Sequence, residues 1–391
     1  MRTHLWIEGW RKLMDEGVAQ ARMLVIARES RGLRQGEVAA AMQALEGPGS
    51  KVSQAYVSRA ESGRLTVTGD RLELFASALG YPVGLLTRAE AEMGAGVGLI
   101  HHRKKQAAPA LELRRIHALL HLSRTQLRRL VAGVPRCAEL AVPRVDVDDF
   151  TSPEDAARLV RAEWGLPAGP LDSVVGAVER AGGLVLTREL LPPVPLDSGN
   201  TSVPVDAVSC FVPDEDPVVL LNAGTPGDRQ RFTLAHELGH MVMHSMPHPD
   251  QERQADRFAA ELLMPAKDIR DDLGAANDLR ALIELKRRWR VSVWALMRRA
   301  HTLGKITDWQ YRNLAVEMTS LGFRTTEPDP LDAERPGAVP DIVRWHLDAD
   351  RTPDDLAELV LLNREEFDSL YRPPLGGNPR ATCSPLYEVL S

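Results

Sequence analysis

Two histidines and a glutamate in the middle of the chain have the types and spacing for metal-dependent hydrolysis. His236, Glu237 and His240 form the pattern H-E-x-x-H. Residues four apart lie about 6 Å apart on one face of an α-helix, so both imidazoles can point at one ion. Zinc chemistry needs nitrogen ligands, an open position for water and a carboxylate that takes the water's proton. The pattern therefore predicts Zn²⁺ held by the histidines and Glu237 as general base; the alternative is a chance pair of core histidines.

The residues before and within the motif predict the helix that positions it. Thr225 is expected as the N-cap, with Pro226 at the first helical position and Asp228 at the third. Apolar residues then recur at helical spacing, which predicts a core-facing stripe of Phe232, Ala235, Leu238 and Val242.

A second amphipathic helix is predicted over residues 250–265, stopped near Pro265. Glu252 on it is the candidate third zinc ligand, and Asp256 could accept the free imidazole N–H of a ligand. The alternatives are a solvated Glu252 and a surface Asp256. His244 is too far along the first helix to share the ion, so we predict a supporting role for it. Glu261 is predicted to point elsewhere.

Composition limits the classes of protein. The 391 residues are 44% apolar and 26% charged, which fits two or three soluble domains. No apolar run approaches the length of a membrane span, and the N-terminus lacks a signal-peptide core. The three cysteines, Cys137, Cys210 and Cys383, form no C-x-x-C pair. We therefore expect a cytoplasmic protein without disulfides and without membrane contact.

Charge is divided unevenly along the chain. The net charge is −6, but residues 1–136 carry 21 Lys and Arg against 12 Asp and Glu, whereas residues 137–391 carry 27 against 42. A basic N-terminal third joined to an acidic remainder indicates different partners for the two parts.

The N-terminal third has the pattern of a small helical bundle. Helices are predicted over residues 19–31, 35–42, 54–61 and 69–79, with a loop at 43–52. Short helices separated by small turn residues are typical of a helix-turn-helix module.

Residues 27–35 and 56–64, followed by Leu79 and Gly80, resemble the XRE or phage-repressor-like helix-turn-helix family. The resemblance covers about residues 19–86 and implies binding of double-stranded DNA, with a recognition helix that starts at Gln54. A glutamine can read adenine in the major groove. The candidate DNA contacts are Gln35, Lys51, Ser53, Gln54, Ser58 and Arg59. The loop before the recognition helix is longer than the usual turn by roughly eight residues, and a module for protein contacts alone stays an alternative.

A basic connector follows the flexible stretch at residues 94–98. Between residues 103 and 136 there are nine Lys and Arg and one Glu, and helix is predicted from Pro109 to Val131. These cations form either a solvated helix face or an additional phosphate-contacting surface.

The middle of the chain predicts helices at 152–164 and 172–181 and strands at 184–187, 205–212 and 218–222. A small antiparallel sheet beside the motif helix offers an edge strand for an extended substrate.

Residues 217–222, 231–240 and 252–265, with His244, resemble the ImmA/IrrE family of metallopeptidases over about residues 152–300. The resemblance implies His236, His240 and Glu252 as ligands of Zn²⁺ and Glu237 as general base. Members of this family cleave phage-repressor-like transcription factors. Residues 304–323 and 353–371 resemble its helical C-terminal extension, whose acidity favours packing or partner binding over DNA contact.

The sequence thus predicts a mostly helical α+β protein in four parts. These are a helix-turn-helix domain (1–90), a basic helical connector (91–150), a zincin-like metallopeptidase domain (151–300) and a helical extension (301–391). The predicted function is a DNA-binding regulator whose zinc endopeptidase cleaves a repressor-type protein in a stress or mobile-element response. The alternatives are a regulator with a non-hydrolytic sensor domain and an antitoxin-type interaction protein. The sequence leaves open whether the chain is a homodimer.

Overall fold

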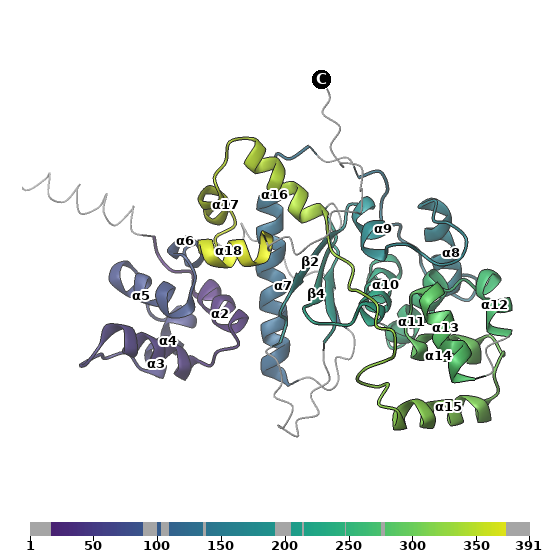
Figure 1. The fold of residues 1–391 in the computed structure, drawn as a ribbon. Helices are drawn as coiled ribbons and strands as arrows, with labels where there is room; N and C mark the ends of the chain where they lie inside the picture. The colour runs from purple at the N-terminus through teal and green to yellow at the C-terminus, as the bar shows by residue number, and fades with distance from the viewer. Residues whose placement is uncertain are drawn as a thin grey trace, which may run out of the picture.

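The chain is mostly helical with one small sheet, as expected. The computed structural model describes residues 17–88, 100–102, 109–135, 138–191, 205–212, 215–246, 248–274 and 278–372. In Figure 1 the N-terminal helices lie at one end, the sheet lies in the middle beside α7 and α10, and α11 to α15 lie at the other end. Most of the predicted loop at 191–204 and part of the predicted connector lie outside the described residues.

Residues 17–88 form five short helices: α2 (Ala21–Ser30), α3 (Gln35–Glu46), α4 (Gln54–Glu61), α5 (Gly69–Leu79) and α6 (Val83–Leu86). The Ser53 hydroxyl accepts a hydrogen bond from the Tyr56 amide and so caps α4 where the sequence predicts its start. The prediction was wrong at the end of α3, which continues past Met42 to Glu46. Good helix formers follow Met42, and Gly47, at φ +89°, ends the helix only there.

The sheet has the strand order β1-β3-β4-β2, with the strands β1 (Ile100–His102), β2 (Leu184–Arg188), β3 (Ala207–Cys210) and β4 (Val218–Asn222). β3 is antiparallel to both β1 and β4, whereas β2 and β4 are parallel. The sheet is therefore mixed rather than purely antiparallel. In chain order, β3 comes between β2 and β4 and runs in the opposite direction to both. The chain therefore reverses twice, and β4 runs in the same direction as β2.

The two faces of the sheet pack into separate cores. Val208 and Cys210 belong to the core that contains α7 (Ala110–Val131), whereas Ala207 belongs to the core that contains α10 (Gly227–Met243). Successive strand residues point to opposite faces, so burial of both faces requires apolar residues at nearly every position. Ser209 is the polar exception in β3, and its side chain is fully buried.

The predicted basic connector becomes a central helix. α7 packs against α2, β3, α16 and α17. Arg124 is buried and donates two hydrogen bonds, of 2.7 and 2.8 Å, to the Glu215 carboxylate, and Arg129 donates to the carbonyl oxygen of Leu359. Both expectations for these cations, a solvated face and a phosphate-contacting surface, are wrong for Arg124 and Arg129, because their guanidinium groups have partners inside the protein. Arg114 stays 57% exposed.

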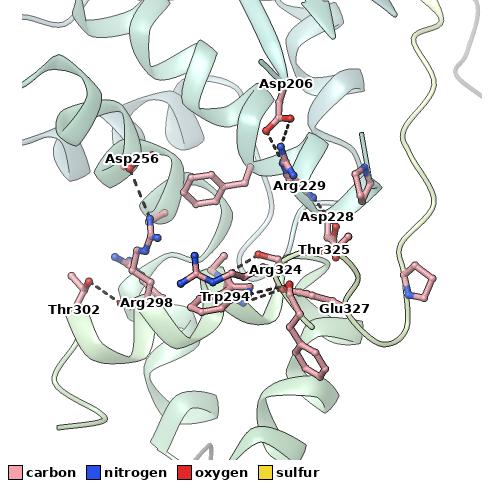
Figure 2. Close-up of a pocket in the computed structure, with 18 of the residues that line it drawn as sticks. Asp206, Asp228, Arg229, Asp256, Trp294, Arg298, Thr302, Arg324, Thr325 and Glu327 are labelled. Atoms are coloured by element: carbon pink, nitrogen blue, oxygen red, sulfur yellow. Dashed lines mark hydrogen bonds and ion pairs between the residues drawn. The ribbon is translucent and has the colours of Figure 1, made fainter. Parts of the chain in front are cut away.

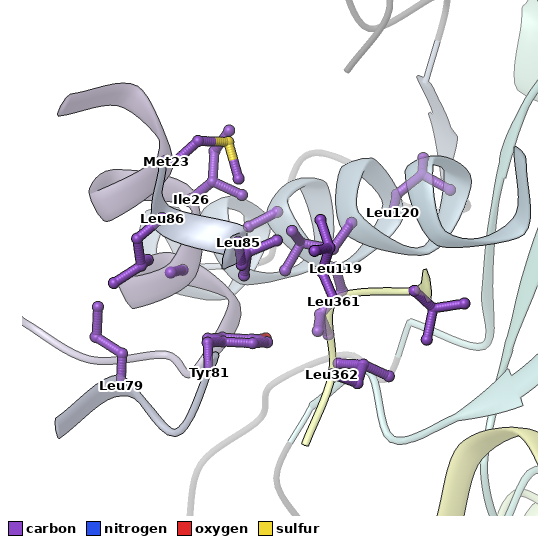
Figure 3. Packing of buried hydrophobic residues seen from close by; sticks show 14 of the residues in the cluster. Met23, Ile26, Leu79, Tyr81, Leu85, Leu86, Leu119, Leu120, Leu361 and Leu362 are labelled. Atoms are coloured by element: carbon purple, nitrogen blue, oxygen red, sulfur yellow. The ribbon is translucent and has the colours of Figure 1, made fainter. Parts of the chain in front are cut away.

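The C-terminal helices hold the helix-turn-helix part against this central helix. They are α16 (Ala338–Asp348), α17 (Pro353–Leu359) and α18 (Arg364–Tyr371). Figure 3 shows Leu361 and Leu362 beside Leu119 of α7 and near Leu85 and Tyr81. Arg31 of the N-terminal part forms hydrogen bonds of 3.0 and 2.7 Å with the Glu366 carboxylate of α18. The expectation that the extension packs is confirmed for these helices.

The described residues contain seven further helices: α8 (Pro153–Glu163), α9 (Val174–Arg180), α11 (Gln251–Leu263), α12 (Ala266–Gly274), α13 (Leu279–Trp289), α14 (Val293–Thr302) and α15 (Asp308–Ser320). Within the ranges given above, none of the helices combines the length and apolar character that a bilayer crossing needs.

Residues 321–337, here called the strap, connect α15 to α16 and are anchored by two buried acids. The Glu327 carboxylate accepts hydrogen bonds from the Lys286 ammonium (2.9 Å) and the Val293 amide (2.8 Å). Glu334 pairs with buried Arg231 and accepts a hydrogen bond from the Val175 amide. Buried charges keep such a segment in place only when they are paired in this way.

A third carboxylate, that of Glu179 on α9, holds the start of α16. It is 8% exposed and accepts hydrogen bonds from the amides of Gly337 and Ala338 at 3.0 Å. Burial raises the pKa of Glu179 to about 7, although the two amide donors act in the opposite direction.

Candidate metal centre

The motif helix α10 forms the floor of the site and is buried along almost its whole length. The predicted N-cap at Thr225 is wrong by one residue, because Pro226 occupies that position and Gly227 begins the helix. The Gly227 amide donates to the carbonyl oxygen of Leu331 in the strap at 3.2 Å, so no side-chain cap is needed. A Cβ on Gly227 would collide with the main chain at Asp332. The strap thus fixes where α10 starts.

Gly239, inside the motif, sets how closely α11 approaches α10. A Cβ at this position would lie 3.0 Å from the Phe258 ring and 3.3 Å from the Cα atom of Ala255, both on α11. The hydrogen of glycine therefore allows the two helices to meet at the residue before His240. This contact brings Glu252, on the first turn of α11, over the two histidines.

The structure brings His236, His240 and Glu252 together. The two Nε2 atoms are 3.1 Å apart, and the Glu252 carboxylate oxygens lie 3.5 Å from each of them. Bond lengths of 2.0–2.1 Å in a tetrahedral zinc site give ligand-to-ligand distances of about 3.3 Å. Two neutral nitrogens and one carboxylate oxygen at this spacing fit Zn²⁺ with a fourth position left over. Among the described residues, this is the group of histidines and acids that could hold a metal ion.

Polar partners on the far side of each imidazole orient it. His236 Nδ1 lies 2.9 Å from Asp256 Oδ1, and His240 Nδ1 lies 2.9 Å from His244 Nδ1. His244 Nε2 is in turn 2.8 Å from Gln254 Oε1. Because the Gln254 oxygen only accepts, His244 donates from Nε2 and accepts at Nδ1, so His240 donates from Nδ1. His240 thereby presents an unprotonated Nε2 toward Glu252, and the contact of His236 Nδ1 with Asp256 leaves His236 Nε2 facing the same carboxylate.

The site favours positive charge. Burial alone would lower the pKa of His236, but its contacts with the carboxylates of Asp256 and Glu252 outweigh burial and raise the pKa to about 9. Burial lowers the pKa of His244, which keeps that ring neutral as the hydrogen-bond chain requires. A divalent cation at the Nε2 atoms would take the place of the proton on His236.

Glu237 lies one residue beyond the first histidine and is fully buried. The Ser209 hydroxyl of β3 donates a hydrogen bond of 2.5 Å to Glu237 Oε2. β3 is therefore the strand that borders the site. The predicted edge strand beside the motif helix is wrong for β3, because β3 pairs with β4 on one side and with β1 on the other, where His101 pairs with Ser209. An extended substrate would have to displace β1 or bind beside it.

Sequence reasoning missed two polar residues of the site. Ser209 stands in an apolar strand, where a lone polar residue on a buried face could have pointed to it. No sequence feature marks Gln254 as part of the site, because a glutamine on the polar face of an amphipathic helix is common. Glu261 points away from the site, as predicted, and pairs with the guanidinium groups of Arg299 and Arg158.

The candidate DNA contacts divide into two groups. Lys51, Gln54 and Arg59 are exposed, Lys51 in the loop before α4 and the other two on α4 itself. Ser53 is occupied as the cap of α4, and Ser58 is half-buried. The Gln35 amide donates to Glu61 Oε2 at 2.9 Å, and Glu61 also holds Arg28. The Gln35 side chain therefore supports the fold of the domain rather than projecting from it.

Two family models match the chain. Residues 21–89 match a helix-turn-helix domain, and residues 201–301 match the IrrE N-terminal-like domain, a peptidase family. The second span contains the motif, Ser209 and Glu252. The two resemblances drawn from the sequence are thus confirmed, and the chain joins a helix-turn-helix domain to a peptidase-like domain. No curated protein matches the chain.

Proposed function

We propose that this chain is a DNA-binding transcription regulator whose second domain is a zinc-dependent endopeptidase acting on a repressor-type protein. The observation that carries the proposal is the convergence of three metal-binding side chains. Two Nε2 atoms and a carboxylate lie 3.1–3.5 Å apart, and Glu237 stands beside the first histidine. We place the protein in the cytoplasm, where its DNA is; a homodimer, which the sequence leaves open, is not part of this proposal.

The residues divide the work of peptide hydrolysis between them. His236, His240 and Glu252 would hold Zn²⁺, which supplies a Lewis acid for water and for the scissile carbonyl. Glu237 would accept the proton of the attacking water and pass it to the leaving amine. The Ser209 hydroxyl donates to one Glu237 oxygen and so fixes the carboxylate on the side of β3.

The test combines metal analysis with a trapping variant. We expect about one equivalent of zinc in the purified protein and in Glu237→Gln, because Glu237 is not a proposed ligand. His240→Ala should lose it. Glu237→Gln should hold an uncleaved protein that mass spectrometry identifies, whereas the unmodified chain should release two fragments of it. Zinc below a few tenths of an equivalent would overturn the proposal.

A regulator whose peptidase-like domain senses a ligand is the second candidate. The pairing of β1 with the outer edge of β3 favours it, because that edge is where a substrate backbone would bind. A Glu237→Gln variant that represses a reporter and responds normally would support this candidate over hydrolysis.

A further inference from the structure

A cavity of about 660 Å³ lies beside the candidate metal centre and has no part in the function described so far. Its walls come from the start of α10, from α11 and α14, and from the strap (Figure 2). Phe232, Trp294 and Phe323 give it apolar surface, and six arginines line it together with five acids.

The cavity shares a wall with the metal centre. Asp256 Oδ1 contacts His236, while Asp256 Oδ2 is 4.0 Å from Arg298 Nη1 inside the cavity. Phe232, which also lines it, is one helical turn before His236 on α10. A group held in the cavity would therefore lie close to a peptide bond at the metal centre, because the Asp256 side chain touches both places.

Most of the charges that line the cavity neutralise each other. Arg229 pairs with Asp206 at 2.5 Å, and Arg257 pairs with Glu154 at 2.7 Å. Three other lining residues pair with groups that do not line the cavity. Arg299 pairs with Glu261, and both Asp228 and Glu327 pair with the Lys286 ammonium. These groups have their partners already and offer little net attraction to a ligand.

Two guanidinium groups differ from the rest. Arg298 is 57% exposed and reaches no carboxylate closer than 4.0 Å among the described residues. Arg324 is exposed, lies 5.7 Å from the centroid of the Trp294 ring and forms no ion pair within the described part of the chain. Its Nε donates only to the Thr319 hydroxyl, at 3.3 Å. Arg298 thus has only this long contact with Asp256, and Arg324 has no carboxylate partner among the described residues.

We propose that this cavity is a specificity pocket for an acidic side chain of the substrate, close to the bond that is cut. This inference rests on the proposed function. The carboxylate would be bound by Arg298 and Arg324, and its aliphatic stem would lie on Trp294. Planar guanidinium groups bind carboxylates in a fixed geometry. A basic side chain would meet the same two cations and be repelled, so the pocket selects by charge as well as by shape.

The test uses a proteome-derived peptide library and two readouts. In the first, the zinc-loaded chain cuts the library, and mass spectrometry records the residues around each cut. In the second, immobilised Glu237→Gln protein captures peptides without cutting them. Each readout compares the unmodified pocket with R298Q/R324Q, R298E/R324E and the control Arg280→Gln, whose side chain is 89% exposed on α13, outside the cavity. Circular dichroism and zinc content verify that each variant is folded.

We expect Asp or Glu at one position near the cut, with a preference of about tenfold for each guanidinium group that contributes. R298Q/R324Q should lose the preference, R298E/R324E should replace it with Lys or Arg, and Arg280→Gln should keep it. Cutting and capture without any acidic preference would overturn the pocket and leave the proposed function intact. Absence of cutting would overturn that function, while capture would still test the pocket. In one further outcome, peptides are captured without acidic preference, and 50 mM succinate at constant ionic strength abolishes that capture. This outcome would show that the cavity binds a free carboxylate and would overturn the substrate assignment.

Discussion

The contact at Gly239 gives a prediction in which two opposing effects can be weighed. In Gly239→Ala, the new Cβ would lie 3.0 Å from the Phe258 ring, about 0.4 Å inside ordinary contact distance. Overpacking of this kind costs about 1–3 kcal/mol, and the better helix propensity of alanine offsets about 1 kcal/mol. We therefore expect the metal-free protein to lose about 0–2 kcal/mol of unfolding free energy.

The effect on zinc should be larger than the effect on stability. Glu252 and Asp256 lie on α11 with Phe258, so any retreat of α11 moves a proposed ligand and the partner of His236 together. Loss of such a partner typically weakens metal binding about 10–100-fold. Chelator competition would measure the zinc affinity, and unfolding with EDTA present would measure stability without the metal's contribution.

A matched control separates packing from helix propensity. Gly36 also lies in a helix, and a Cβ there would meet nothing within 4 Å. Gly36→Ala should leave zinc affinity unchanged and add up to about 1 kcal/mol of stability. If Gly239→Ala binds zinc within about twofold of the unmodified chain, Gly239 does not set the position of α11 and the reasoning is refuted.

Three further predictions follow from contacts already described. Asp256→Asn should weaken zinc binding about 10–100-fold in chelator competition, because His236 loses its anionic partner; an unchanged affinity would contradict this. Because the pKa of Glu179 is raised from 4.5 to about 7, the folded chain keeps a proton that the unfolded chain releases between these values. Unfolding free energy should therefore fall by up to about 3 kcal/mol as pH rises from 4.5 to 7, and Glu179→Gln, measured by denaturant titration, should lack this part of the fall. Gln54→Ala should weaken DNA binding by about 1–3 kcal/mol in a gel-shift assay without loss of stability, whereas Gln35→Ala should lower stability by about 1 kcal/mol; equal effects of the two on stability would contradict the assignment.

Local signals predicted the helices well, because caps and apolar spacing act within a few residues. Ser53 fixed the start of α4, and the spacing of His236 and His240 placed both rings on one face. The errors arose where the partner is distant in sequence. The start of α10 depends on the carbonyl of Leu331, more than 100 residues away. Arg124 looked like a surface cation, because nothing local shows that Glu215 meets it.

The candidate site shows the same division. The motif and Glu252 could be chosen from spacing, since each lies on a strongly patterned helix. Their convergence depends on the packing of α10 on α11 at Gly239, and the support from Ser209 depends on sheet register. Neither contact can be predicted from one sequence, because neither produces a hydrophobic periodicity or a capping residue. The domain bounds drawn at residues 90, 150 and 300 stay predictions.

The core that α7 organises also contains residues of the helix-turn-helix part and the rear face of the sheet. Met23 and Phe75, Leu119, and Leu186 and Val208 belong to one apolar cluster. A helix-turn-helix fragment that ends near residue 88 would therefore expose apolar side chains that α7 covers in the whole chain. This fragment should precipitate more readily than a repressor domain that folds on its own. Heat or denaturant should melt the two halves in one shared transition. Selection on the helix-turn-helix half and selection on the peptidase-like half then act on the same side chains, so neither half can drift in sequence independently of the other.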